Sequence, residues 1–187
     1  MHAPKLVTAP LTYPVDIADV KQHLRVGHAD DDTLINGYIA AATGYLDGYV
    51  GILGRCLILQ TWEQVFDAFS ACMRLPLLPA YSIEEISYTN TAGDQETLAE
   101  ASYEVLADAL GAYVSILNTP SNVSGRVTIT YIAGYGDETK VPAPIKAAIM
   151  LHVGSLYEVR ERELVGVSFV ETGTYQALIA PYRRLSI

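Results

Sequence analysis

The hydrophobic positions of the chain follow two different periods, which divide it into helical and extended segments. Near the N-terminus and again after Val141, apolar residues recur every three or four positions, which is the spacing of an amphipathic helix. Between these segments, over residues 56–135, short runs of β-forming residues alternate with turn residues. The pattern predicts an α+β fold, with a helical base, an inserted and mostly antiparallel β-unit, and a C-terminal extension.

The same pattern predicts boundaries within one domain that spans residues 1–187. Two N-terminal helices and a long C-terminal helix would pack together, because an amphipathic helix alone cannot bury its apolar face. The expected segments are N-terminal helices at 14–55, a β-rich insert at 56–136, a long helix at 141–163 and a tail at 164–187.

The two N-terminal helices carry recognisable start signals. Asp16 is placed to cap the first helix, which Gly27 is expected to end. The second helix starts with three acids and continues as an apolar stripe from Leu34 to Val50. Capping and a favourable interaction with the helix dipole are the common explanation for such acids. A cation site is the alternative for the three acids, which are Asp30, Asp31 and Asp32.

Three glycines interrupt the stripe of the second helix. Each costs about 1 kcal/mol relative to Ala in a helix interior. The cost suggests that another backbone passes close by, either in the same subunit or in a neighbouring one. These glycines are Gly37, Gly44 and Gly48.

The long C-terminal helix begins with Pro142 and Pro144, which suit a first turn because their missing N–H groups are not needed there. His152 lies on its apolar stripe, and either fills the core or serves as a ligand or catalytic base. We favour the core, because no partner set of His, Cys or acids stands at a useful spacing. The terminal stretch "TYQALIAPYRRLSI" predicts a short helix broken at Pro181. It is too short to fold alone, so it either orders on docking or packs back on its own domain.

Charge changes the list of possible partners. The net charge is −9, and residues 56–140 hold eleven acidic and three basic side chains, a net of −8. Phosphate binding needs clustered Lys and Arg, so the middle of the chain argues against a grip on nucleic acid. Residues 141–187 are mildly basic, with four acids and five bases. Apolar runs are too short for a membrane span, and the N-terminus lacks the apolar run of a signal peptide.

Candidate chemistry is sparse. Cys56 and Cys72 lack the spacing of a zinc site and are read as reduced core thiols of a cytoplasmic product. Gly134 and Gly136 lack both the spacing of a phosphate loop and a following Lys-Ser/Thr, so they are read as turn glycines. No GxSxG or HExxH motif is present. We therefore expect no enzyme, no cofactor and no metal. A small hydrolase using His152 or the three acids, and a nucleic-acid-binding module, are the alternatives.

A series of segments in consistent order over residues 14–161 resembles the head–tail connector, or adaptor, family of long-tailed phages, prophages and gene transfer agents. The resemblance lies in "KxHLRV", "DD…I", "RLP" and "AGYG…VPxxIKxAI…LYExR" taken together, and residues 162–187 match only loosely. It implies a structural protein of the particle neck that forms a ring, usually of twelve copies. That ring lies below the portal, joins it to the stopper or next tail component, and continues the channel for double-stranded DNA.

The resemblance also implies which residues meet partners. The family's C-terminal extension reaches toward the portal, which assigns portal binding to Tyr175, Leu178, Ile179, Tyr182, Arg183, Arg184 and Leu185. Aromatic and apolar anchors beside two arginines are typical of interface hot spots. The β-unit would face a neighbouring subunit or the tail, and the residues expected there are Tyr88, Asn90, Gly93 and Asp94.

Overall fold

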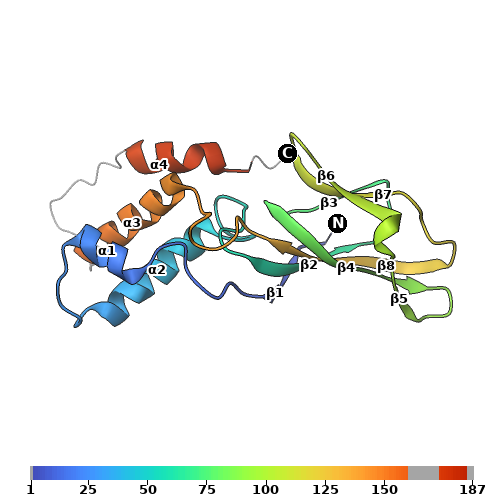
Figure 1. The fold of residues 1–187 in the computed structure, drawn as a ribbon, viewed down its shortest axis with the longest axis horizontal. Helices are drawn as coiled ribbons and strands as arrows, with labels where there is room; N and C mark the ends of the chain where they lie inside the picture. The colour runs from blue at the N-terminus through green and yellow to red at the C-terminus, as the bar shows by residue number, and fades with distance from the viewer. Residues whose placement is uncertain (1, 160–172, 185–187) are drawn as a thin grey trace. The chain divides into compact units, whose positions relative to one another are not determined.

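The computed structural model describes residues 2–159 and 173–184, which form two compact units (Figure 1). The β-unit is made from residues 1–11 and 55–136, and the helical unit from residues 12–54 and 137–187. The predicted α+β class is confirmed. The chain contributes two separate pieces to each unit. Residues 55–136 divide the helical unit, and residues 1–11 belong to the β-unit although the first two helices separate them from its remainder.

The larger sheet of the β-unit has five antiparallel strands in the order β1-β2-β8-β4-β5. The central strand, β8, pairs with β2 and β4 along most of its length, with Tyr131 opposite both Trp62 and Ile83. The strands are β1 (Lys5–Thr8), β2 (Gln60–Phe66), β8 (Val123–Ala133), β4 (Ala80–Asn90) and β5 (Gln95–Thr97).

The smaller sheet has three antiparallel strands in the order β3-β7-β6. They are β3 (Cys72–Arg74), β7 (Gly111–Ile116) and β6 (Tyr103–Asp108), with the short 3-10 helix η1 (Glu100–Ser102) before β6. Alternate residues of both sheets enter one hydrophobic core, as strand periodicity requires. Its fully buried members include Met73, Val114, Val127, Ile129 and Tyr131.

Strands β1 and β3 were not expected from the sequence. They are four and three residues long, too short to display a period. The predicted turn at Gly134 is confirmed, since its φ is +139° and an added Cβ would lie 2.5 Å from the carbonyl oxygen of Ile58.

The helical unit contains α1 (Ile17–Leu24), α2 (Asp32–Leu46), α3 (Ala143–Glu158), α4 (Gly173–Ile179) and the 3-10 helix η2 (Ala180–Tyr182). Helix α3 packs against α1, α2 and α4, and Figure 1 shows α4 running beside it. The buried hydrophobic side chains of these helices are Val20, Ile35, Ile39, Ala42, Leu46, Ile145, Ala148, Ile149, Val153 and Ile179. None of the helices in the described ranges is both long and apolar enough to cross a bilayer.

Several helix ends differ from the prediction. The cap at Asp16 is confirmed, with the Ala18 N–H donating to its carboxylate. Helix α1 ends at Leu24 rather than at Gly27, because Arg25 adopts a left-handed conformation, φ 58°, and its N–H satisfies a helix carbonyl. Helix α2 ends at Leu46, so the predicted stripe is too long at its C-terminal end. Helix α3 ends at Glu158, and residues 160–163 of the predicted helix lie outside the described residues.

Candidate interaction surfaces

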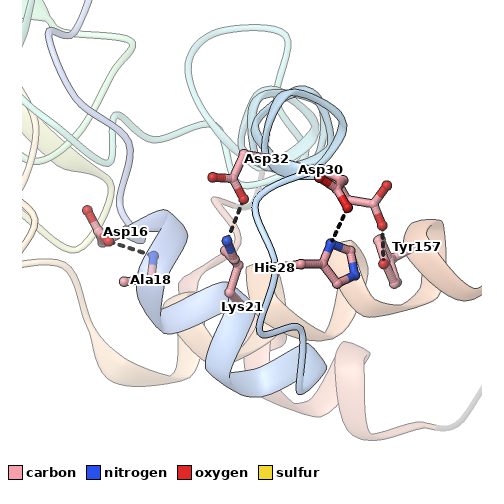
Figure 2. A network of polar contacts seen from close by, with 8 residues as sticks. Asp16, Ala18, Lys21, His28, Asp30, Asp32 and Tyr157 are labelled. Carbon is pink, nitrogen blue, oxygen red and sulfur yellow. Dashed lines mark hydrogen bonds and ion pairs between the residues drawn. The ribbon is translucent and has the colours of Figure 1, made fainter.

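The three acids at the start of α2 are engaged with three different partners (Figure 2). Asp32 accepts from the Lys21 ammonium at 2.6 Å, and Asp31 accepts from the hydroxyl of Tyr157. Asp30 lies 3.6 Å from a ring nitrogen of His28. The contacts of Asp32 and Asp31 tie α2 to α1 and α3 and stabilise helix packing, whereas Asp30 pairs with His28 within the preceding loop. The expected capping is only partly correct, because Asp31 occupies the N-cap position without a side-chain bond to the backbone.

Within residues 2–159 and 173–184, no group of three or more His, Cys, Asp or Glu side chains is arranged to hold a metal ion. His152 lies between two aromatic rings, with Tyr45 at 5.4 Å and Tyr175 at 5.7 Å between ring centroids, both edge to face. Its Nδ1 is buried without a hydrogen-bond partner in the described part of the chain. Burial lowers the pKa of His152 and favours the neutral ring, which is the behaviour of a core histidine.

A polar network fixes the turn between β4 and β5, which we call the hairpin tip (residues 90–96). The Asn90 side-chain oxygen accepts from the N–H groups of Ala92 at 2.8 Å and Asp94 at 2.9 Å. This arrangement satisfies the turn's backbone donors locally, as Asn does in Asx turns. The Asn90 amide nitrogen then donates to Glu96 at 2.6 Å, which links the turn to the start of β5.

Glu96 collects two further donors at the base of the hairpin tip. The hydroxyl of Tyr88 donates at 2.7 Å, and the side-chain amide of Asn122 donates at 3.2 Å. Hydrogen bonds from Asn90, Tyr88 and Asn122 lower the pKa of Glu96, so it stays ionised. The hydrogen bond to Glu96 is the larger cause, and burial the smaller one, that raises the pKa of Tyr88. A turn held in this way presents a fixed shape to a partner without further ordering.

The structure separates the four residues expected at this surface into two roles. Tyr88 and Asn90 are buried and support the turn, whereas Gly93 and Asp94 are exposed at its end. The sequence analysis missed Glu96 and Asn122. Nothing in the local pattern indicates that Asn122, which lies 26 residues after Glu96, returns to the same turn.

The terminal segment, which we define as residues 173–184, packs on the helical unit. Ile179 is fully buried, and Tyr175 is half-buried against His152. The hydroxyl of Tyr175 has no hydrogen-bond partner among the described residues, and burial raises its pKa to about 12. The backbone N–H of Arg184 donates to the carbonyl of Leu53 at 2.9 Å. Of the two alternatives for the tail, packing on its own domain is the one that residues 173–184 adopt.

The residues expected to bind the portal therefore differ in how far they are buried. Tyr175 and Ile179 are used in packing, Leu178 and Tyr182 are half-buried, and Arg183 is exposed. Leu185 lies outside the described residues. A surface built from the outer side of this segment would use Tyr182, Arg183 and Arg184 rather than the whole apolar stripe.

Three solved structures resemble this fold over the whole chain. A protein in "Neck of empty GTA particle computed with C6 symmetry" aligns at TM-score 0.81 and 22% identity. One in "Virion of native gene transfer agent (GTA) particle" aligns at 0.76 and 21%, and one in "Neck of native GTA particle computed with C12 symmetry" at 0.72 and 20%. Each alignment covers 100% of this chain and 97% of the other. The TM-scores establish a shared fold, and at identities this low the likeness establishes the fold alone.

Sequence comparison finds one family to which part of the chain is similar. No curated protein is a significant match to the chain. Residues 14–102 match the model of the family described as "Phage gp6-like head-tail connector protein". This match covers α1, α2 and the strands β2 to β5, and it confirms the resemblance found from the ordered sequence segments. Over residues 14–102, the chain is therefore similar to the phage gp6-like head–tail connector family.

Proposed function

We propose that this protein is a structural subunit of a ring in the neck of a phage or gene transfer agent particle. The ring joins the portal to the stopper or next tail component and continues the channel for double-stranded DNA. The family match over residues 14–102 is the observation that carries the proposal. The likeness to proteins of gene transfer agent necks, solved with C6 and C12 symmetry, supports a twelve-copy ring.

The contacts of the candidate polar side chains support a structural role rather than a catalytic one. In the described ranges, Asp31 and Asp32 serve helix packing, Asp30 pairs with His28, and His152 serves the core. A catalytic site needs a nucleophile, a base and an orienting group held together, or a metal shell. The three acids and His152, which were the candidates for such groups, are instead engaged in hydrogen bonds, an ion pair and ring contacts within the described residues.

We assign one partner surface to each unit. In the helical unit, the terminal segment binds the portal through Tyr182, Arg183 and Arg184, with Tyr175, Leu178 and Ile179 holding it in place. Leu185, outside the described residues, stays an expected portal contact. In the β-unit, the hairpin tip contacts a neighbouring subunit or the tail through Gly93 and Asp94. The fixed geometry around Asn90 and Glu96 supports this second assignment, because little conformational entropy is lost on docking.

The acidity of the chain fits passage of DNA without binding. Twelve copies at −9 each give −108 for the ring. A channel wall of that sign repels the phosphate backbone. We expect the purified ring to show no salt-sensitive binding to duplex DNA. Tight binding at low salt that weakens steeply with added salt would reject this part of the proposal.

The proposal is tested by mixing the full-length protein with portal rings of the same particle and measuring mass during size-exclusion chromatography. We expect one ring of this protein to join each portal ring. Deleting residues 174–187 should leave a folded protein that no longer joins the portal. If the truncated protein still completes particles, the terminal segment is not the portal contact. If the full-length protein never associates with the portal, the connector role fails.

A further inference from the structure

We propose that the 47–54 loop, which follows α2, belongs to the same docking surface as the terminal segment and supplies its apolar anchor through Val50, assisted by Tyr49. The inference rests on the proposed function, because it requires that the terminal segment meets a partner protein. It adds residues that neither the family resemblance nor the hot-spot composition of the tail indicated.

The loop is fixed within its own subunit. Three backbone hydrogen bonds fold it over the end of α2, from Ile52 N–H to Tyr45 at 3.0 Å, Leu53 N–H to Leu46 at 3.3 Å, and Gly54 N–H to Gly51 at 3.0 Å. Gly48 takes a positive φ of 76° that other residues rarely adopt. The loop therefore holds one shape before any partner arrives.

This fixed loop displays apolar side chains to solvent. Val50 is 91% exposed and Tyr49 is 49% exposed, while Leu53 in the same loop is fully buried. A single exposed aliphatic residue is ordinary on a protein surface. Here it stands on a turn whose backbone is already ordered, so burying it against a partner costs little conformational entropy. Apolar and aromatic side chains held in this manner are typical anchors of an interface.

The loop is continuous with the terminal segment. The Leu53 carbonyl accepts the N–H of Arg184, and a Cβ added to Gly54 would lie 3.3 Å from the Cβ of Arg184. At the other end of the loop, Tyr45 accepts the Ile52 N–H and contacts His152, which in turn contacts Tyr175. The loop is therefore bordered at both ends by residues that hold the terminal segment, and Val50 stands on the same loop as the Leu53 carbonyl that accepts from Arg184.

The chemistry of this combined surface selects its occupant. An apolar tip beside Arg183 and Arg184 fits a protein surface that offers an apolar pocket bordered by carboxylates. The occupant is the protein that receives the terminal segment, which we propose to be the portal. A nucleic acid would gain only the two arginines, against a chain of net charge −9.

The test compares binding of full-length variants to immobilised portal rings. Val50→Asp places a charge on the tip, and we expect at least tenfold weaker binding with an unchanged melting temperature, because the side chain is exposed. Leu117→Asp is the matched control, since Leu117 is 53% exposed in the β-unit, and its binding should equal that of the wild type. Val50→Ser removes the apolar side chain without adding a charge, and it should weaken binding by a smaller factor. This variant keeps the test valid if Val50→Asp does not fold.

The outcomes separate the two proposals. If Val50→Asp binds like the wild type while deletion of 174–187 abolishes binding, the loop is not part of the surface and the connector role stands. If Leu117→Asp weakens binding as much as Val50→Asp, the effect is one of general charge and the inference is overturned. If the unmodified protein does not bind the portal, the proposed function fails, and the inference fails with it.

Discussion

The ring of Tyr175 on α4 meets the ring of His152 on α3 edge to face, with the centroids 5.7 Å apart and the planes at 80°. Tyr45 on α2 meets the same imidazole at 5.4 Å and 84°. One histidine is therefore the point at which α2, α3 and the terminal segment share an aromatic cluster. The positive edges of the rings face electron-rich ring faces in such pairs, which stabilises them beyond simple burial.

We expect acid to weaken the helical unit through His152. Burial lowers its pKa below the ordinary 6.5, so the unfolded chain takes up this proton more readily than the folded one. The stability that the neutral ring contributes is complete above pH 6.5 and is lost as the pH falls through the lowered pKa. Urea midpoints measured at about pH 7.5 and about pH 5.5 should differ less in His152→Phe than in the wild type.

The control for this prediction is His28→Gln, because His28 is exposed. It should keep the full acid sensitivity of the wild type. If His152→Phe and the wild type show the same pH dependence, the pKa of His152 does not differ between the folded and the unfolded protein, and the prediction is wrong.

Ile179→Ala should release the terminal segment while α1, α2 and α3 remain folded. Truncating a fully buried Ile costs about 2–5 kcal/mol, and a helix of seven residues has little stability of its own to offset this. Limited proteolysis should then cut within residues 173–184 faster than in the wild type. Ala177→Ser, at an exposed position of the same helix, should be cut at the wild-type rate. Equal cutting of both variants would mean that Ile179 does not hold the segment.

Two glycines near the end of α2 should respond to alanine in opposite directions. Gly44 lies inside the helix and an added Cβ meets nothing within 4 Å in the described part of the chain, so Gly44→Ala should stabilise the isolated protein by up to about 1 kcal/mol. Gly48 has φ 76°, so Gly48→Ala should destabilise it by about 1 kcal/mol or more. Urea unfolding of both variants measures these changes.

The same pair tests where the expected close backbone lies. The sequence left two places for this backbone, the same subunit or a neighbouring one. No described residue lies within 4 Å of a Cβ added at Gly37 or Gly44, so the neighbouring subunit is the alternative that remains for these two glycines. If so, Gly44→Ala should stabilise the isolated subunit and yet impair ring formation. A variant that is more stable and assembles normally would remove any packing role for this glycine.

Asn90→Ala should loosen the hairpin tip without unfolding the β-unit. It removes the acceptor of two backbone N–H groups and one donor to Glu96, and losing buried hydrogen bonds of this kind costs about 1–3 kcal/mol. Amide hydrogen exchange at Ala92 and Asp94 should become at least tenfold faster, while exchange in β8 stays slow. Thr91→Ala, at an exposed position of the same turn, should leave both rates unchanged.

The elements with a clear period could be predicted from the sequence. The alternation of Val127, Ile129 and Tyr131 identified β8, and the three- and four-residue spacing identified α2 and α3. Helix ends could not be placed in the same way. Arg25 ends α1 in a left-handed conformation that glycine usually takes, and the stripe continues through Tyr49 and Val50 although the backbone has already turned.

The interaction surfaces were less accessible to sequence reasoning, because they depend on contacts between distant residues. Hydrogen bonding of Asn122 to Glu96 and of Arg184 to Leu53 links segments that share no local pattern. The apolar composition of "TYQALIAPYRRLSI" indicated burial but not its target. The sequence of this stretch is the same whether Ile179 packs on its own helices or on a partner protein. Only the folded structure distinguishes these two arrangements.

The interleaving of the chain has a practical consequence for dissecting the protein. Each unit is assembled from two stretches, so no contiguous fragment contains one whole unit without residues of the other. A recombinant piece beginning at Arg55 would lack β1 and leave the outer backbone of β2 bare, inviting aggregation through that edge. Isolating the β-unit instead calls for circular rearrangement or a covalent graft that returns Lys5–Thr8 to its place beside Glu63 and Trp62.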